Sequence, residues 1–197
     1  MVSIKVTKVI AIVFYSASGV TRQLAEAIGT GVDAVAGARA SLYPISGDDI
    51  EKGRFVNESL LQAIDEVDAV IFGSPTYMGG PAAQFKAFAD ASGNRWSRQR
   101  WAGKVAAGFT SGECPSGDQL ASLQYFNLFA SQHGMIWCGL DIATGYDPRG
   151  RNPLGAFLGL ASQKEKKGLN TIYLETAQYL GARVAKLATQ VSSQQAF

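Results

Sequence analysis

Hydrophobic residues along this chain form short uninterrupted runs, which alternate with stretches in which they recur every three or four positions. The run at 9–15 is apolar throughout, as is typical of a strand that is covered on both faces of a sheet. After a short polar gap, Leu24, Ile28 and Val32 recur at helical spacing, which predicts an amphipathic helix with one buried face. The start of the chain therefore predicts a strand followed by a helix that packs on it.

The same alternation repeats to the end of the chain and predicts one α/β domain that covers residues 1–197. Further strands are expected at 39–43, 68–73, 104–109 and 135–140. Further helices are expected at 58–66, from a first turn with Pro81 through Phe85, Phe88 and Ala89, from Leu120 through Leu123 and Phe126 to Ala130, and at about 171–190. The segment 141–170 is rich in glycine and proline, and we expect it to be a long excursion before the last helix.

Five strands separated by helices predict a doubly wound, five-stranded parallel sheet, because crossovers between parallel strands are right-handed and leave few topologies. We expect the strand order 2-1-3-4-5, with helices on both faces. In such a sheet, ligands bind beyond the carboxyl ends of the strands, at the switch between the first and third strands. This rule nominates the loops at 16–21, 74–80 and 110–118, each of which is rich in Gly, Ser, Thr or Pro.

The first of these loops has the composition of a phosphate site. It joins a buried strand to a helix N-terminus, where unpaired backbone N–H groups and the helix dipole favour an anion. A Walker A loop would need a lysine, and a dinucleotide-binding loop would need three spaced glycines, whereas this loop has one glycine and no lysine. The hydroxyls could alternatively serve only to cap the helix. We favour a bound phosphate, and the residues concerned are Ser16, Ala17, Ser18, Gly19, Val20 and Thr21.

Composition excludes several classes of protein. The formal net charge is +2, which is too small to indicate a nucleic-acid partner. No apolar run approaches the roughly 20 residues that span a bilayer, and the first run lacks the basic start of a signal peptide. Cys114 and Cys138 have no metal-ligand spacing, so neither a metal site nor a disulfide framework is expected. These observations favour a cytoplasmic enzyme.

The pattern Ser16-x-Ser18-Gly19-x-Thr21 resembles the phosphate loop of flavodoxins, which bind flavin mononucleotide (FMN). The segments 73–80 and 84–88 resemble the loop and helix after the third strand in the NAD(P)H:quinone oxidoreductases of the tryptophan-repressor-binding-protein (WrbA) family. Similar segments follow in the same order at 103–104, 110–112, 133–135 and 152–156, and in the closing helix. The resemblance covers nearly the whole chain. It implies a flavodoxin-like fold that binds FMN and transfers two electrons from NADH or NADPH to a quinone in a ping-pong cycle.

The same resemblance implies a role for each loop. The first loop would hold the phosphate of FMN. The second would orient the flavin ring through Pro75, Thr76, Tyr77, Met78 and Gly79. The third would contact the ribityl chain and the ring through Thr110, Ser111, Gly112, Glu113 and Gly117.

Two residues outside the loops match residues of the family's substrate site. His133 corresponds to a histidine that lies over the flavin of a neighbouring subunit, and as the catalytic group it would donate a hydrogen bond to a quinone oxygen. Trp96 corresponds to a tryptophan that lines the substrate pocket. A homo-oligomer is therefore expected. On the residues alone, His133 could equally be structural, and Trp96 could be a core residue beside Trp101.

An alternative function stays open, that of a flavodoxin-type carrier of single electrons between partner proteins. Flavodoxins resemble one another in being strongly acidic, which steers them to basic partners, and the net charge of +2 argues against this alternative. The chain also departs from the WrbA pattern at Ser18 and at 77–80, where that family has an aromatic residue and the run Arg-Phe-Gly-Asn. Five arginines could bind nicotinamide phosphates or form a solvated face, namely Arg95, Arg98, Arg100, Arg149 and Arg151.

Overall fold

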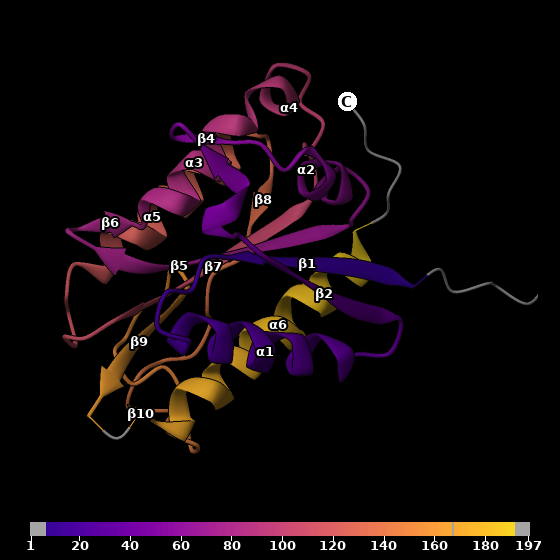
Figure 1. Cartoon of the computed structure of the whole chain (residues 1–197). Coiled ribbons are helices and arrows are strands. Elements are labelled where there is room, and N and C mark those ends of the chain that lie inside the picture. Colours follow the sequence, from indigo (N-terminus) through magenta and orange to yellow (C-terminus); the bar gives the residue numbers. More distant parts are fainter. Residues whose placement is uncertain (1–6, 167, 192–197) are drawn as a thin grey trace, which may run out of the picture.

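A twisted, mostly parallel sheet forms the centre of the protein, with helices on both of its faces (Figure 1). The computed structural model describes residues 7–166 and 168–191. The main strands are β1 (Lys8–Phe14), β2 (Ala38–Pro44), β5 (Ala69–Tyr77), β7 (Val105–Gly112), β9 (Leu160–Glu165) and β10 (Gly168–Leu169). Their order across the sheet is β10-β9-β7-β5-β1-β2, and only β10 on this path runs antiparallel to its neighbour.

Each face of the sheet is covered by its own set of helices. One face carries α1 (Val20–Asp33) and α6 (Thr171–Gln190). The other carries α2 (Glu58–Asp65), α3 (Ala83–Ala91) and α5 (Gln119–Gln132) (Figure 1). The smaller elements are η1 (Gly47–Asp49), β3 (Ile50–Glu51), β4 (Arg54–Phe55), β6 (Gly80–Pro81), α4 (Gly93–Ser97) and β8 (Ile136–Trp137).

The two faces of the sheet bury two separate hydrophobic clusters, as the uninterrupted apolar run of the first strand predicts. Along β1, Ile10 and Ile12 pack with α1 and α6, whereas Ala11 and Val13 pack with the helices on the other side. Successive side chains of a strand point to opposite faces, so a strand buried on both sides needs apolar residues at every position. The α/β fold and the order of the first four strands are confirmed, since they appear as β2-β1-β5-β7.

The predicted fifth strand at 135–140 is wrong in its extent. Only β8 pairs with the start of β7, and the edge of β7 from Phe109 to Gly112 pairs instead with β9. Leu140 and Ile142 are buried, but they pack in the cluster with α6 and form no part of the sheet. The segment 141–170 is therefore less irregular than expected, because it contains β9 and β10.

Two smaller expectations also fail. Pro81 does not begin a helix: it lies in β6, which pairs with the end of β5 in a hairpin, and α3 starts at Ala83. Leu120 does not line the buried face of α5, since 55% of its surface is exposed, whereas Leu123, Phe126 and Ala130 are fully buried.

The helices α1 and α6 approach each other closely because each presents a glycine to the other. A Cβ atom at Gly31 would lie 1.9 Å from the carbonyl oxygen of Gln178, and a Cβ atom at Gly181 would lie 2.1 Å from that of Ile28. No side chain fits at these distances. This contact fixes α6 against the helix that follows the first loop.

Candidate functional site

The three loops nominated by the sequence lie at one edge of the sheet, because β1, β5 and β7 are neighbours and end at the same side. The N–H of Tyr15, at the start of the first loop, donates to the carbonyl of Gly73 at 3.0 Å. The hydroxyls of Thr21 and Ser111 are 3.0 Å apart and join the first loop to the third. Residues almost a hundred positions apart are thus brought together.

The first loop presents a row of backbone donors. The N–H groups of residues 17–21 donate to no residue that the structure describes, whereas the next N–H, of Arg22, donates to the Ser16 hydroxyl at 3.1 Å. Gly19 has a φ of 87° and is the residue before the helix, with no side-chain cap. This left-handed conformation favours glycine. Helix capping therefore accounts for Ser16 but not for Ser18, which is exposed.

Thr21 is not a free donor, as only 2% of its surface is exposed and its hydroxyl contacts Ser111. A threonine hydroxyl has one proton and two lone pairs. If Ser111 donates to Thr21, the proton of Thr21 stays available for an anion at the helix start. The Thr21–Ser111 pair thus sets the direction in which that proton can point.

The second loop is a tight hairpin. Tyr77 pairs with Gly80, and the two residues between them have positive φ angles, 48° at Met78 and 79° at Gly79. Two central residues with positive φ define the type I′ turn that joins twisted strands. Met78 is fully exposed and Tyr77 is half exposed, so the hairpin offers an apolar tip at the edge where the loops meet.

The hydroxyls of the second and third loops are used mostly within the protein. Thr76 Oγ1 lies 2.8 Å from Thr110 Oγ1 and 2.7 Å from Ser122 Oγ, and Thr110 also donates to the carbonyl of Ser74. Thr110 is fully buried. These side chains fasten β5, β7 and α5 together, which leaves the backbone of the two loops as the surface that a ligand would meet.

The third loop is held by a residue that the sequence did not single out, Gln119. Its side-chain amide donates to the carbonyls of Cys114 and Pro115 at 3.1 and 3.4 Å, and its oxygen accepts from the N–H of Ser162 at 3.2 Å. The side chain is buried, and a Cβ atom at Gly112 would lie 3.2 Å from it. The only signal in the sequence was its position directly after the glycine-rich loop. Glu113 and Gly117 lie on the exposed part of this loop.

These loops fit the phosphate and ring of FMN. Five N–H groups that have no partner among the described residues, together with the exposed Ser18 hydroxyl, are the donors that a phosphate at a helix N-terminus requires,. The loop contains no carboxylate that would repel the anion. Beside it, the exposed hairpin and the exposed third loop provide backbone groups for the polar edge of a flavin.

His133 and Trp96 are brought together, but far from the loops of the same chain. His133 follows the last turn of α5, whose 14 residues separate it from the third loop by about 20 Å,. Both residues line a cavity of about 240 Å³ between α3, α4 and α5. Burial lowers the pKa of His133 to about 4. Trp96 and His133 could therefore lie beside the three loops only if the loops belonged to another subunit of an oligomer.

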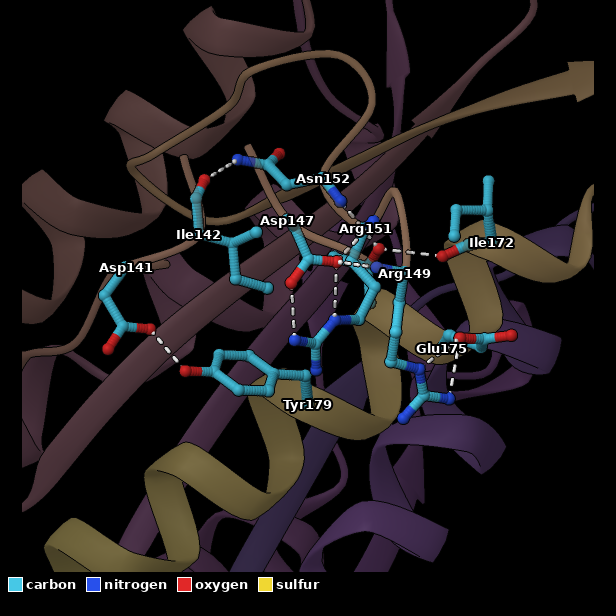
Figure 2. A network of polar contacts seen from close by, with 10 residues as sticks. Asp141, Ile142, Asp147, Arg149, Arg151, Asn152, Ile172, Glu175 and Tyr179 are labelled. Atoms are coloured by element: carbon cyan, nitrogen blue, oxygen red, sulfur yellow. Dashed lines mark hydrogen bonds and ion pairs between the residues drawn. The ribbon is translucent and has the colours of Figure 1, made fainter. Parts of the chain in front are cut away.

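Four of the five arginines considered for nicotinamide binding are paired with carboxylates. Arg95 contacts Glu58 and Asp65, and Arg100 contacts Asp65. Figure 2 shows the other two, of which Arg149 joins the excursion after β8 to α6, whereas Arg151 bonds within the excursion. There the pairs are Arg149 with Glu175 and Arg151 with Asp147, and the hydrogen bonds from Arg151 lower the pKa of Asp147 to about 2. These contacts support the interpretation of a charged surface that stabilises the fold.

Fold and loops together define a flavodoxin-like FMN-binding protein. The family model described as NADPH-dependent FMN reductase matches residues 7–145. A solved WrbA-like flavodoxin from Agrobacterium tumefaciens is 37% identical, with a TM-score of 0.73, and the match covers 94% of this chain and 99% of that one.

Curated relatives span the chain equally well. Flavodoxin FldP of Pseudomonas aeruginosa is 35% identical over 188 residues, which is 91% of this chain and 96% of the relative. An NAD(P)H dehydrogenase (quinone) of Geobacter sulfurreducens is 33% identical and covers 92% of this chain and 98% of its own length. The chain belongs to the NADPH-dependent FMN reductase family, and its fold is that of WrbA-like flavodoxins.

Proposed function

We propose that this protein is an FMN-dependent oxidoreductase that transfers two electrons from NADH or NADPH to a quinone. The observation that carries the proposal is the row of N–H groups at the start of α1 that donate to no residue in the described part of the chain, at the edge where all three loops meet. The family match and the quinone dehydrogenases among its relatives support it. Bound FMN would supply the redox chemistry.

The residues of the chain bind FMN and the substrate and orient them. Residues 16–21 hold the phosphate through backbone N–H groups and hydroxyls, and 75–79 with 110–113 and Gly117 hold the ring and ribityl chain. Gln119 keeps the third loop in place. Trp96 and His133 form the substrate side of the site, supplied by a neighbouring subunit.

Thr21 provides the test of the phosphate site. In Thr21→Val the dissociation constant of FMN should rise by about tenfold or more, because a hydrogen bond to a charged group is lost, whereas riboflavin, which lacks the phosphate, should bind nearly as before. Fluorescence titration measures both. Thr30→Val is the matched control, since Thr30 lies on the same helix and its hydroxyl donates to the carbonyl of Glu26. Equal losses for FMN and riboflavin would contradict the assignment.

Steady-state kinetics test the reaction. With NADPH or NADH and a soluble benzoquinone, double-reciprocal plots at several quinone concentrations should be parallel, as a ping-pong cycle requires. Intersecting lines would show that both substrates bind at once and would reject the alternating use of one site.

The relative FldP makes a second function worth testing, that of a single-electron carrier. A potentiometric titration of the purified protein distinguishes the two. An enzyme of the proposed kind should titrate in one two-electron step, and a carrier in two well-separated one-electron steps.

We also propose that the protein is a cytoplasmic homo-oligomer. Helix α5 contains no charged residue, although Leu120 and Leu128 on it are more than half exposed. A second copy that covers this face would bring the His133 cavity to another subunit's loops. Both cysteines are unpaired, as suits a reducing compartment,, and no helix among the described residues has the length and apolarity to cross a bilayer. Light scattering should give a dimer or tetramer, and Leu128→Glu should shift it to monomer.

A further inference from the structure

Arg22 places a positive charge at the end of α1 where the helix itself does not favour one. It is the third residue of α1, and the first turn of that helix contains no acidic residue. The helix dipole concentrates partial positive charge at this end, so an anion is stabilised there and a cation is not. A cation in the first turn is therefore unfavourable for the helix alone and becomes favourable once an anion is bound beside it.

The guanidinium of Arg22 forms no ion pair with any residue that the structure describes. Glu26, four positions further along α1, would be its ordinary helical partner. Instead, the guanidinium carbon lies 5.6 Å from the centre of the Phe14 ring, within the range of a cation–π contact. Several other arginines of the protein are paired with carboxylates. The charge of Arg22 thus remains available for a ligand.

Two contacts hold Arg22 beside the first loop. Its backbone N–H donates to Ser16 Oγ at 3.1 Å, at the beginning of the loop. Its guanidinium lies over Phe14, which is fully buried and stands two positions before Ser16. Attraction between charges extends about 8 Å at physiological ionic strength, so the guanidinium attracts a phosphate on the loop without having to touch it.

The charges of the three loops make this contribution matter. The segments 15–24, 73–81 and 110–118 contain one basic residue, Arg22, and two acidic residues, Glu113 and Asp118. Both acidic residues are exposed on the third loop. A phosphate monoester carries close to two negative charges at pH 7. Without Arg22, the only full charges in these segments would repel the phosphate.

We propose that Arg22 determines the preference of this site for a phosphorylated flavin, because it supplies the full positive charge that the hydroxyls and N–H groups of the first loop lack. The inference rests on the proposed function, in which the first loop holds the phosphate of FMN. It adds a specificity-determining residue outside the loops. It also makes the affinity for the phosphate sensitive to salt, since exposed charges are screened.

Fluorescence titration of the FMN-free protein with FMN and with riboflavin tests the proposal. At low salt, Arg22→Gln should weaken FMN by about fivefold, the effect of one exposed charge pair, and should leave riboflavin nearly unchanged. In 1 M NaCl, where the screening length is about 3 Å, wild type and variant should bind FMN alike. An unchanged ratio of FMN to riboflavin affinity at low salt would overturn the proposal. An equal loss of FMN affinity at both salt concentrations would overturn it as well, because a purely structural effect is not screened.

Two further variants separate a local charge from other effects. Arg39→Gln removes the same charge from an exposed position level with Val9, at the opposite end of β1 from Phe14, and should keep the wild-type ratio. Arg22→Lys keeps the charge but not the planar group, and should retain most of the preference for FMN. A loss in Arg39→Gln as large as that in Arg22→Gln would contradict the proposal, and so would a loss in Arg22→Lys as large as that in Arg22→Gln.

The wild type separates this inference from the proposed function. A wild type that binds riboflavin as tightly as FMN would refute the phosphate site itself. A wild-type preference for FMN that persists undiminished in Arg22→Gln would refute only the role of Arg22.

Discussion

Met78 holds an uncommon backbone conformation for a side chain of its kind. It occupies the first position of the type I′ turn with a φ of 48°, and its side chain is fully exposed. Asn, Asp and Gly dominate such turns, because other residues in the left-handed region cost about 1–2 kcal/mol. Since Met78 packs against nothing in the chain itself, nothing within the described residues compensates for that cost.

Met78→Asn should therefore stabilise the FMN-free protein by about 1 kcal/mol, measured by urea unfolding. Met78→Leu serves as the control, because it keeps the unfavourable conformation, and it should leave stability unchanged. If the two variants were equally stable, the turn would not be under strain. A loss of FMN affinity in Met78→Asn would in addition show that the exposed thioether contacts the ring.

His133 should make stability depend on pH. The buried ring has a pKa of about 4, whereas an unfolded histidine has one near 6.5,. Between these values the unfolded chain binds a proton that the folded protein does not, so stability is lost as pH falls from 6.5 to 4 and is unaffected by this group above 6.5. The shift corresponds to about 3 kcal/mol.

The experiment compares the unfolding free energies of wild type and His133→Phe across that range. Contributions of carboxylates cancel in the difference, which should change by about 3 kcal/mol between pH 7 and pH 4, to the disadvantage of the wild type. A constant difference would mean that His133 has the same pKa in the folded and unfolded states.

Among the elements, α1 and α6 depend on their two facing glycines. Gly31→Ala would place a methyl group 1.9 Å from a backbone carbonyl, so the helices must separate, and we expect a loss of about 3 kcal/mol. Gly29→Ala is the matched control two positions earlier, where the nearest atom is a Leu42 methyl at 3.2 Å. That side chain can move, and alanine favours a helix, so thermal unfolding should change little. Similar losses at both positions would argue against a specific helix contact.

Gln119 connects three elements through one amide, and its loss should loosen the third loop. In Gln119→Leu, the N–H of Ser162 and two loop carbonyls lose their partner. We expect FMN to bind about tenfold more weakly and the amides of 113–118 to exchange hydrogen faster. Gln124→Leu, at an exposed position of the same helix, controls for the added apolar side chain and should behave as wild type. Unchanged hydrogen exchange in Gln119→Leu would mean that the third loop keeps its conformation without the Gln119 side chain.

For the fold, the sequence predicted what depends on local pattern. Continuous apolar runs identified β1, β5 and β7, because strands buried on both faces admit few polar residues. The edge of the sheet formed by β9 and β10 could not be predicted in this way. β9 is buried at Leu160 and Ala161 but exposed at its end, so its pattern is weak. The apolar residues of 135–140 pack instead into both hydrophobic clusters, Met135 and Trp137 into one and Cys138 and Leu140 into the other.

The candidate site, too, could be predicted in part. Its three loops could be located because the topology of the sheet fixes which strand ends meet, and the assignment of their residues to FMN stays a prediction. The inward turn of Thr76 and Thr110 and the role of Gln119 could not be foreseen, since both depend on which side chains meet across the sheet. Trp96 and His133 were paired by resemblance, and the chain does place them around one cavity.

The edge of β7 pairs with two separate strands, β8 at its start and β9 at its end, and this has a consequence for biosynthesis. The outer edge of β7 from Phe109 to Gly112 finds its partner only in β9, about 50 residues further along the chain. At ribosomal rates of about 5–20 residues per second, that edge waits several seconds with its backbone groups unpaired. During this interval the nascent chain carries an open strand edge of the kind that chaperones shield and that pairs with other chains. Because β9 is synthesised late, the edge of β7 beside the proposed flavin site is protected only after β9 has left the ribosome.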